Sequence, residues 1–313
     1  MPAAPGGPVS RYVDDRRVRR AARCQVGVAL ALGLLSASGA RADSNDLQIY
    51  RLGSTSDPSA VTRLRLLGDE LGVAISSTTL APANTVGIDG FDFGFQTSFV
   101  FINSGASVGG QPYWVTEQLP PSVLVVPQLH FRKGLPYSFE VGGSLSTIAN
   151  SHLFAGAAEV KWGILEGFRY APDLSARFSV SRLFGQNDFD LTSGVLDFTL
   201  GKEFGIAGLF SLAPYLGYAL TGIDTSSRVF WGAPTSTTQN QYLQNPVANQ
   251  QIFPEQGISK NFYDRFYAGV RLLSYVVSLD LEYGYSHPSA FNAGGFPTSD
   301  GLSTLAAKLA LTF

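Results

Sequence analysis

Residues 91–101 read Phe-Asp-Phe-Gly-Phe-Gln-Thr-Ser-Phe-Val-Phe, and this stretch decides the fold. Five of its six odd positions are phenylalanine, and the sixth is Thr97. The positions between them begin polar or small, with Asp92, Gly94, Gln96 and Ser98. Side chains alternate between the two faces of a β-strand, so a period of two predicts a strand with one strongly apolar face.

The same alternation returns nine times toward the C-terminus. The runs cover residues 123–132, 137–146, 154–164, 174–181, 196–200, 210–220, 265–272, 277–285 and 304–313. About ten residues per strand is the length that crosses a bilayer when the strand is tilted. Strands of soluble sandwiches are usually about five or six residues long, and their exposed faces carry more Lys and Glu than the Ser- and Gly-rich second face of these runs. The pattern predicts an all-β fold, a transmembrane antiparallel up-and-down β-barrel of about ten strands (8–12), over residues 88–313.

The composition agrees with a barrel and excludes other classes. Charged residues make up 15% of the 313 residues, whereas a typical globular chain has about 25%. Hydrophobic residues make up 45%, and the mean hydropathy is only +0.10. So little charge excludes a coiled coil and a charge-driven disordered chain. The formal charge of −2 argues against a nucleic-acid partner.

The first 42 residues have the three parts of an export signal peptide. A basic region at residues 16–23 precedes an apolar run over residues 24–35, and Ala40-Arg41-Ala42 forms a small-residue cleavage site. We expect cleavage between Ala42 and Asp43. A transmembrane anchor is the alternative, but it requires about 20 apolar residues. The mature chain would carry 15 basic and 22 acidic residues, a net charge of −7, and no cysteine.

The connections between the runs alternate in length, as transmembrane barrels require. The last strand of such barrels runs toward the periplasm, so counting back from residue 313 assigns a side to each connection. The outward connections are 287–301, 222–260, 183–189, 148–151 and 103–121, and the periplasmic ones are 273–275, 201–207, 165–173 and 132–136. The outward link at 148–151 is short and the turn at 165–173 is long, but the others fit. An even strand number also returns the mature N-terminus to the periplasm.

The C-terminal run from Leu305 to Phe313 reads Leu-Ala-Ala-Lys-Leu-Ala-Leu-Thr-Phe. It alternates and ends in phenylalanine, and it resembles the terminal strand of bacterial outer-membrane β-barrel proteins. The resemblance covers about residues 88–313. It implies a location in the cell outer membrane, contact with outer-membrane lipid, and a role for Phe313 in the signal that the barrel-assembly machinery reads. It implies no particular activity.

Residues 43–87 lack the strand pattern and are interpreted as a periplasmic N-terminal segment. Ser56-Asp57-Pro58 predicts a helix start, and apolar residues follow at helical spacing. These apolar residues are Val61, Leu64, Leu67 and Leu71. We expect a short amphipathic helix over residues 59–71, with Gly72 as its stop. Three locations stay open for it: the lumen, the barrel mouth and the membrane surface. Residues 71–77 are also compatible with the start of an extra strand.

The polar faces of the strands provide candidate lumen residues of both charge signs. The candidates are Asp92, Gln96, His130, Arg132, Glu140, Glu159, Lys161, Arg177, Asp197, Arg265, Arg271, Asp280, Glu282 and Lys308. Side chains fill an eight-stranded barrel, and about two more strands widen it only slightly. A polar core of ion pairs is therefore the first interpretation, and a narrow channel is the second. Asp280 and Glu282 point the same way and need a cationic neighbour, for which Arg265 or Arg271 is suitable.

Aromatic residues near the ends of predicted strands are typical of membrane interfaces. Tyr137 and Trp162 fall near the periplasmic rim, and Tyr283 and Tyr285 fall near the outer rim. Two further tryptophans, Trp114 and Trp231, fall in predicted outer loops, where they would anchor those loops or a ligand.

The sequence predicts no cofactor, no metal site and no enzymatic activity. The three histidines, His130, His152 and His287, fall at separate places on the barrel. An outer-rim hydrolase is a distant alternative. Its candidate catalytic residues would be His287 with Asp300, or Asp188 with Asp190, and no catalytic motif connects them.

The predicted function is therefore a structural, envelope or surface-interaction role with a largely filled lumen. A passive channel for small solutes is the alternative.

Overall fold

The computed structural model describes residues 45–206, 209–228, 230–231, 250–292 and 300–313. Residues 43–313 form one compact unit. The expected signal peptide at residues 1–42 and its cleavage site at Ala42 and Asp43 lie outside the described residues and stay predictions. Most of the long outward connection, residues 232–249, also lies outside them.

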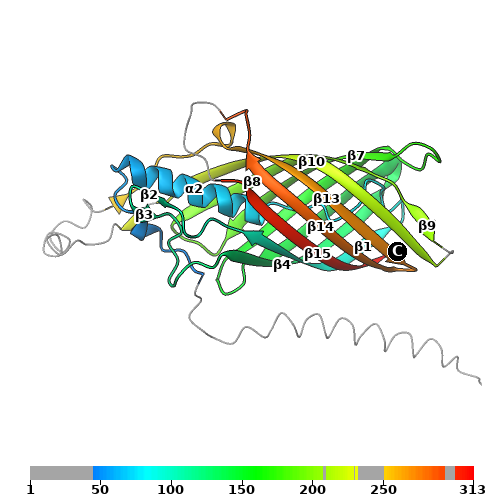
Figure 1. The fold of residues 1–313 in the computed structure, drawn as a ribbon, viewed down its shortest axis with the longest axis horizontal. Coiled ribbons are helices and arrows are strands. Elements are labelled where there is room, and N and C mark those ends of the chain that lie inside the picture. The colour runs from blue at the N-terminus through cyan, green and yellow to red at the C-terminus, as the bar shows by residue number, and fades with distance from the viewer. Residues whose placement is uncertain (1–44, 207–208, 229, 232–249, 293–299) are drawn as a thin grey trace, which may run out of the picture. The chain divides into compact units, whose positions relative to one another are not determined.

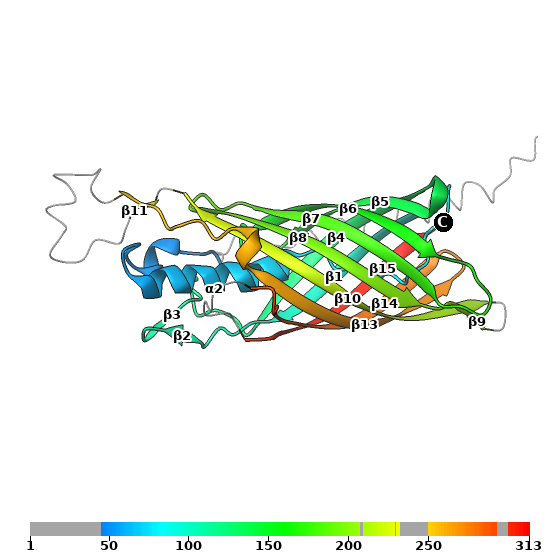
Figure 2. The same ribbon diagram turned by 90° about the horizontal axis from the view of Figure 1, so that it is seen from above.

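Ten antiparallel strands form the wall of a closed barrel (Figure 1, Figure 2). In chain order they are β1 (Phe91–Phe101), β4 (Val123–Leu135), β5 (Phe139–Thr147), β6 (Phe154–Leu165), β7 (Asp173–Phe184), β8 (Phe189–Gly201), β10 (Phe210–Ser227), β13 (Phe262–Ser274), β14 (Val277–Pro288) and β15 (Leu302–Thr312). Each strand pairs with its neighbours along the chain, and β1 pairs with β15 to close the wall. The described residues confirm the predicted all-β antiparallel barrel and its strand number.

Short strands and 3-10 turns lie in the connections between the strands of the wall. The strand β9 (Phe204–Ile206) pairs with the start of β10, and two small hairpins lie in the connections. These hairpins are β2 (Ser107–Val108) with β3 (Gln111–Pro112), and β11 (Phe230–Trp231) with β12 (Gln250–Gln251). The described residues also form the 3-10 turns η1 (Ile49–Leu52), η2 (Pro136–Ser138) and η4 (Ile258–Lys260).

The alternating residues of each strand face the inside and the outside of the barrel in turn. In β1, Asp92 and Gln96 are buried inside the barrel, while Phe93 and Phe95 are exposed on its outer face. The same holds around the wall, which presents a belt of exposed large apolar side chains. They include Phe99, Phe131, Leu145, Phe154, Val160, Phe178, Phe198, Leu216, Phe266, Leu279, Leu305 and Leu309. Such a belt is suited to lipid rather than to water.

The two rims of the barrel differ. The short-turn rim holds the connections after β4, β6, β8 and β13, together with the C-terminus, where Phe313 and Phe91 exchange backbone hydrogen bonds of 2.9 and 3.1 Å. The long-loop rim holds the connections after β1, β5, β7, β10 and β14. The β10–β13 connection covers residues 228–261 instead of the expected 222–260, because β10 continues to Ser227, opposite Phe189 of β8.

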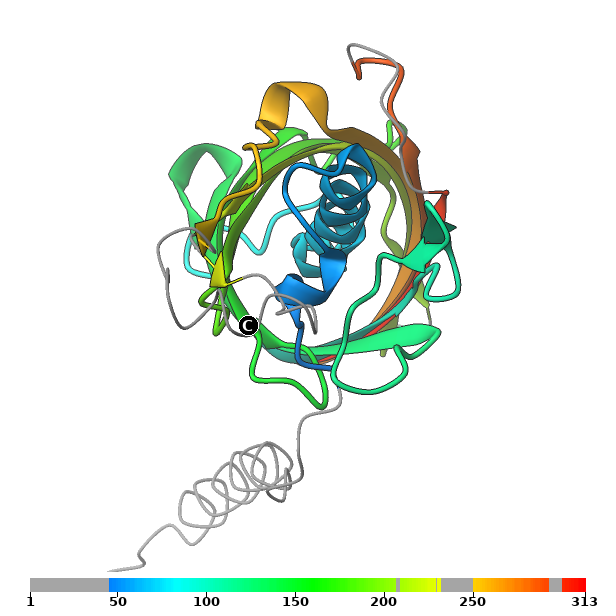
Figure 3. The ribbon, with the colours of Figure 1, turned by 90° about the vertical axis from the view of Figure 1, so that its left-hand side faces the viewer.

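A single α-helix, α2 (Pro58–Ile75), is described; it begins among the long loops, and its C-terminal half enters the barrel against β10 (Figure 1, Figure 3). The Asp57 side chain caps it by accepting a hydrogen bond from the Ser59 N–H at 2.9 Å, and Pro58 occupies the first turn as expected. The predicted stop at Gly72 is wrong, because the helix continues to Ile75. Among the described residues, no helix combines the length and the apolar character needed to cross a membrane.

The N-terminal segment runs through the barrel. Residues 45–52 contact the long-loop rim, α2 then packs mainly against β10, and residues 76–87 continue through the lumen to β1. No extra strand forms at residues 71–77. Of the three locations open to the helix, the structure shows the mouth and the lumen: α2 starts among the long loops and its C-terminal half enters the barrel.

Candidate functional site: the occupied lumen

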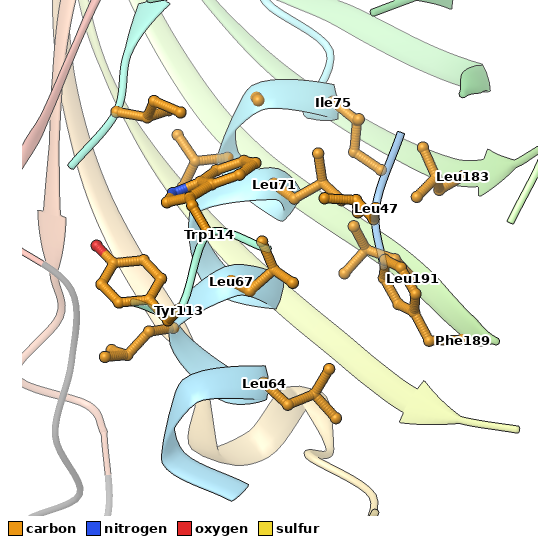
Figure 4. Close-up of a cluster of buried hydrophobic side chains, with 14 of the residues drawn as sticks. Leu47, Leu64, Leu67, Leu71, Ile75, Tyr113, Trp114, Leu183, Phe189 and Leu191 are labelled. Atoms are coloured by element: carbon orange, nitrogen blue, oxygen red, sulfur yellow. The ribbon is translucent and has the colours of Figure 1, made fainter. Parts of the chain in front are cut away.

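An apolar stripe of α2 packs against the barrel wall near the long-loop rim. Leu64, Leu67, Leu71 and Ile75 are spaced at three and four residues, so they share one face of the helix. Their neighbours in this buried cluster include Leu47, Leu183, Phe189 and Leu191 (Figure 4). Burying one Leu or Ile side chain contributes about 1.5–3 kcal/mol. The stripe therefore stabilises the helix in its place within the lumen.

Two glycines let α2 lie flush on β10. A Cβ atom at Gly68 would lie 2.5 Å from Thr225 Oγ1, and one at Gly72 would lie 2.6 Å from Ile223 Cγ2. Each glycine within a helix costs about 1 kcal/mol relative to alanine. Here that cost accompanies a close approach of helix and wall that a larger side chain would prevent.

The carboxylate of Glu70 joins the helix to the first long loop. Tyr113 Oη and Trp114 Nε1 each donate a hydrogen bond of 2.6 Å to it, and Asn103 Nδ2 donates another of 3.0 Å. Burial raises the pKa of Glu70, and these hydrogen bonds oppose the shift. Trp114 is buried, so it anchors its loop to the helix.

Two further charged side chains of α2, Arg63 and Asp69, form hydrogen bonds inside the protein. Arg63 donates hydrogen bonds to the carbonyl oxygens of Leu52, at 2.7 Å, and Val108, at 2.8 Å. Tyr263 Oη of β13 donates to Asp69 Oδ2 at 3.1 Å. Burial raises the pKa of Asp69 to about 7, and the guanidinium of Arg65, 3.9 Å away, only partly offsets it. Both charged groups fix the helix to loops and wall.

Residues 76–87, called the lumen segment here, cross the rest of the barrel without regular structure. Arg177 Nη2 donates to Ser77 O at 2.8 Å, and Arg132 Nη2 donates to Thr79 O at 2.7 Å. Lys161 Nζ donates to the carbonyl oxygens of Pro82 and Asn84, both at 2.8 Å. The lumen segment has no secondary structure to pair its carbonyl groups, so side chains of the wall provide the hydrogen bonds that water would otherwise make.

Carboxylates of the wall bind the amide groups of the same segment. Leu80 donates its N–H to Glu282 Oε2 at 3.2 Å, and Val86 donates its N–H to Glu140 Oε1 at 2.5 Å. The side chain of Thr79 also contacts Asp197 Oδ2, at 3.3 Å. Positively and negatively charged side chains from several strands of the wall therefore form hydrogen bonds with the lumen segment.

All fourteen lumen candidates lie inside the wall with buried or nearly buried side chains. Six are acidic, six are Lys or Arg, and the other two are Gln96 and His130. With a neutral His130, the fourteen residues carry no net charge. Equal numbers of buried charges of each sign are what a self-satisfied polar core requires.

The charges are paired between strands, in most cases neighbouring ones. Arg177 contacts both Asp197 and Glu159 at 2.6 Å, and Arg132 shares Glu159. Arg265 lies 2.7 Å from Glu282 and Arg271 lies 2.7 Å from Asp280, so the acidic pair of β14 has its cations on β13. Lys308 lies 3.3 Å from Asp92, and Lys161 lies 3.7 Å from Glu140.

The two uncharged candidates lie on adjacent strands. Gln96 donates a hydrogen bond to Thr78 of the lumen segment and another, at 3.4 Å, to Gln128. His130 Nδ1 lies 4.0 Å from Asp92 Oδ1, and neither ring nitrogen has a hydrogen-bond partner among the described residues. These groups complete the polar layer around the lumen segment.

The aromatic candidates lie on the outer face of the wall. Tyr137 is exposed at the short-turn rim, and Trp162 stacks on Phe139 with ring centroids 5.8 Å apart. Tyr283 and Tyr285 are exposed on β14, which ends at the long-loop rim. The side chain of Trp231 lies outside what the structure describes.

Two residues of the hydrolase alternative have other contacts in the described structure. Asp190 contacts Arg228 at 2.6 Å and Arg182 at 3.2 Å, so its carboxylate belongs to a rim ion-pair group. His287 stacks beside Phe266, with ring centroids 5.9 Å apart. No cluster of three or more metal-ligating side chains occurs among the described residues.

Several residues that shape the lumen were not apparent from the sequence. Arg63, Arg65, Asp69 and Glu70 lie off the apolar stripe of α2, and their polar character gives no sign that they are buried. The lumen segment carries no periodic pattern at all. Glycines four residues apart within a predicted helix, Gly68 and Gly72, were the one available signal of close packing.

Comparison with known proteins adds only a likeness of fold. No family model and no curated protein matches the chain. Among solved structures it is similar to Ail, the attachment invasion locus protein of Yersinia pestis, with 14% identity over 72% of this chain and 97% of that chain, and a TM-score of 0.28. It is also similar to the N-terminal β-barrel domain of Pseudomonas aeruginosa OprF, with 9% identity over 72% and 99% and a TM-score of 0.31.

A third similar structure is LpxR from Salmonella typhimurium, with 9% identity over 61% of this chain and 73% of that chain, and a TM-score of 0.33. Identities and TM-scores this low carry no functional argument. The fold stands on the chain's own closed wall of ten strands and its apolar outer belt. This is the architecture of outer-membrane β-barrel proteins.

Proposed function

We propose that this protein is an outer-membrane barrel that its own N-terminal segment keeps closed. In this proposal its role is structural or surface-directed, and it is neither a passive channel nor an enzyme. The observation that supports it best is the lumen segment, whose backbone is hydrogen-bonded to Arg132, Lys161 and Arg177 from three strands of the wall.

Electrostatics favours the closed state. A conducting lumen would have to release the lumen segment, and so break the hydrogen bonds that charged wall side chains donate to its carbonyl groups. A hydrogen bond to a charged group contributes about 1.5–3 kcal/mol. Arg132, Lys161 and Arg177 each donate to this segment, so several such contacts would be lost together.

The two faces of the barrel define the partners in this proposal. The apolar belt would contact outer-membrane lipid, and β15 with Phe313 would present the assembly signal. The long-loop rim, where residues 45–57 meet the long connections, is the surface that a ligand or another cell component would contact.

Single-channel recording in planar bilayers tests the closed state. We expect no stable current steps from the wild-type protein. Gly72→Trp should produce them, because a side chain at this position collides with Ile223 and displaces α2. Gly257→Trp is the matched control, since a Cβ atom there meets nothing within 4 Å. Stable steps from the wild-type protein would contradict the proposal and favour the passive channel.

A further inference from the structure

The direction in which the chain passes through the barrel has a topological consequence. Residues 45–57, called the N-terminal arm here, lie at the long-loop rim, and the end of the lumen segment lies at the short-turn rim, where Gly134 donates its N–H to Gly90 O at 3.0 Å. Between these points the chain runs once through the lumen. The arm and β1 therefore start on opposite sides of the barrel.

The arm is fixed to the long-loop rim by several independent contacts. Gln48 donates its N–H to Val115 O at 2.7 Å, and Asn45 donates its N–H to Asn150 O at 2.9 Å. The carboxylate of Asp46 accepts the His152 N–H at 2.7 Å and lies 2.5 Å from His152 Nδ1. The contacts join the arm to two connections of that rim, those after β1 and after β5.

The long-loop rim is the outer side if the barrel lies in an outer membrane. Such barrels have short periplasmic turns and longer extracellular loops. The short turns, the C-terminus and the start of β1 share one rim here, and the arm lies at the other. The parity of the strands, which was expected to return the N-terminus to the periplasm, fixes only the start of β1. The passage through the lumen then reverses the side.

We infer that the N-terminal arm is displayed on the outer surface of the cell, because the chain between it and β1 passes through its own barrel. This inference rests on the proposed outer-membrane location. It makes the arm a part of the protein's outward surface together with the long loops. A ligand or antibody that approaches the cell from outside would therefore meet the arm, while the C-terminus stays on the periplasmic side.

Thiol labelling of intact cells tests the inference. The sequence has one cysteine, Cys24, so a Cys24→Ser background leaves each introduced thiol alone. Ser54→Cys places an exposed thiol on the arm. Two matched controls report the rims: Leu119→Cys on the long-loop rim, where the side chain is 93% exposed, and Tyr170→Cys on the short-turn rim, where it is 90% exposed. The probe is a polyethylene-glycol maleimide too large to pass through outer-membrane porins, read as a gel shift.

We expect Ser54→Cys and Leu119→Cys to shift nearly completely in intact cells, and Tyr170→Cys only after permeabilisation. If Leu119→Cys shifts in intact cells but Ser54→Cys does not, the inference is overturned while the barrel proposal stands. Labelling of Tyr170→Cys alone in intact cells would reverse the sides and overturn it as well. Fractionation of the same cells keeps the two proposals apart, because absence from the outer-membrane fraction would refute the location itself.

Discussion

Gly72 lies where α2 meets the barrel wall, and replacing it measures how tightly the helix is seated. The three atoms nearest to an added Cβ all belong to the buried side chain of Ile223, at 2.6, 2.9 and 2.9 Å. Gly72→Ala gains about 1 kcal/mol of helix propensity but overpacks the contact, which costs about 1–3 kcal/mol. The single substitution should therefore lower the free energy of unfolding by about 0–2 kcal/mol.

Ile223→Ala removes all three of those atoms. Alone it should cost about 2–5 kcal/mol, as large-to-small core substitutions do. In the Ile223→Ala background, Gly72→Ala should instead stabilise the protein by about 1 kcal/mol, because only the helix propensity remains. The double-mutant cycle should thus show a coupling of about 1–3 kcal/mol.

The assay is reversible urea unfolding of the barrel in phospholipid vesicles, followed by tryptophan fluorescence. Gly257→Ala in the same two backgrounds is the control and should be additive within about 0.5 kcal/mol, because no atom lies near its added methyl group. Stabilisation by Gly72→Ala in the wild-type background, with no coupling to Ile223, would show that the helix does not rest on β10.

Two further predictions concern charges. Because the pKa of Asp69 is raised from 3.8 to about 7 in the folded protein, its contribution to stability is complete below pH 4 and is lost as the pH rises through 7. Urea midpoints of Asp69→Asn should lack this dependence, and an unchanged slope would refute the assignment. Arg177→Met should cost about 3–5 kcal/mol because it leaves Glu159 and Asp197 with fewer cations. Arg182→Met at the exposed rim should cost less than about 1 kcal/mol, and equal costs would argue against a buried network.

The wall could be predicted from the sequence because alternate side chains of a strand face the lipid and the lumen, and these two environments require different residue types. In β1 every phenylalanine at an odd position faces outward, and Asp92 and Gln96 face inward. The end of β10 was missed for the same reason. Gly222 and Asp224 interrupt the apolar alternation there, although the strand continues to pair with β8 as far as Ser227.

The contents of the lumen could not be predicted, because their interactions join residues far apart in the sequence. Thr79 meets Arg132 through a backbone carbonyl group, which carries no residue-specific signal. Glu70 has the polar character of a solvent-facing helix position, and only the folded chain brings Tyr113 and Trp114 to it. The helix end was missed because Gly72 serves close packing and not termination.

The central claim is that the C-terminal half of α2 enters the barrel and packs against β10. The most direct measurement is a disulfide between Gly68→Cys and Thr225→Cys in the Cys24→Ser background. An ideal Cβ atom at Gly68 lies 3.2 Å from Thr225 Cβ, close to the range of about 3.5–4.5 Å found in disulfides. Gly68→Cys with Leu279→Cys, which faces outward on β14, is the matched control. A linked peptide found by mass spectrometry of the outer-membrane protein in the first pair, and absent in the second, is the predicted result. Two thiols that stay free and open to alkylation in the first pair would contradict the claim.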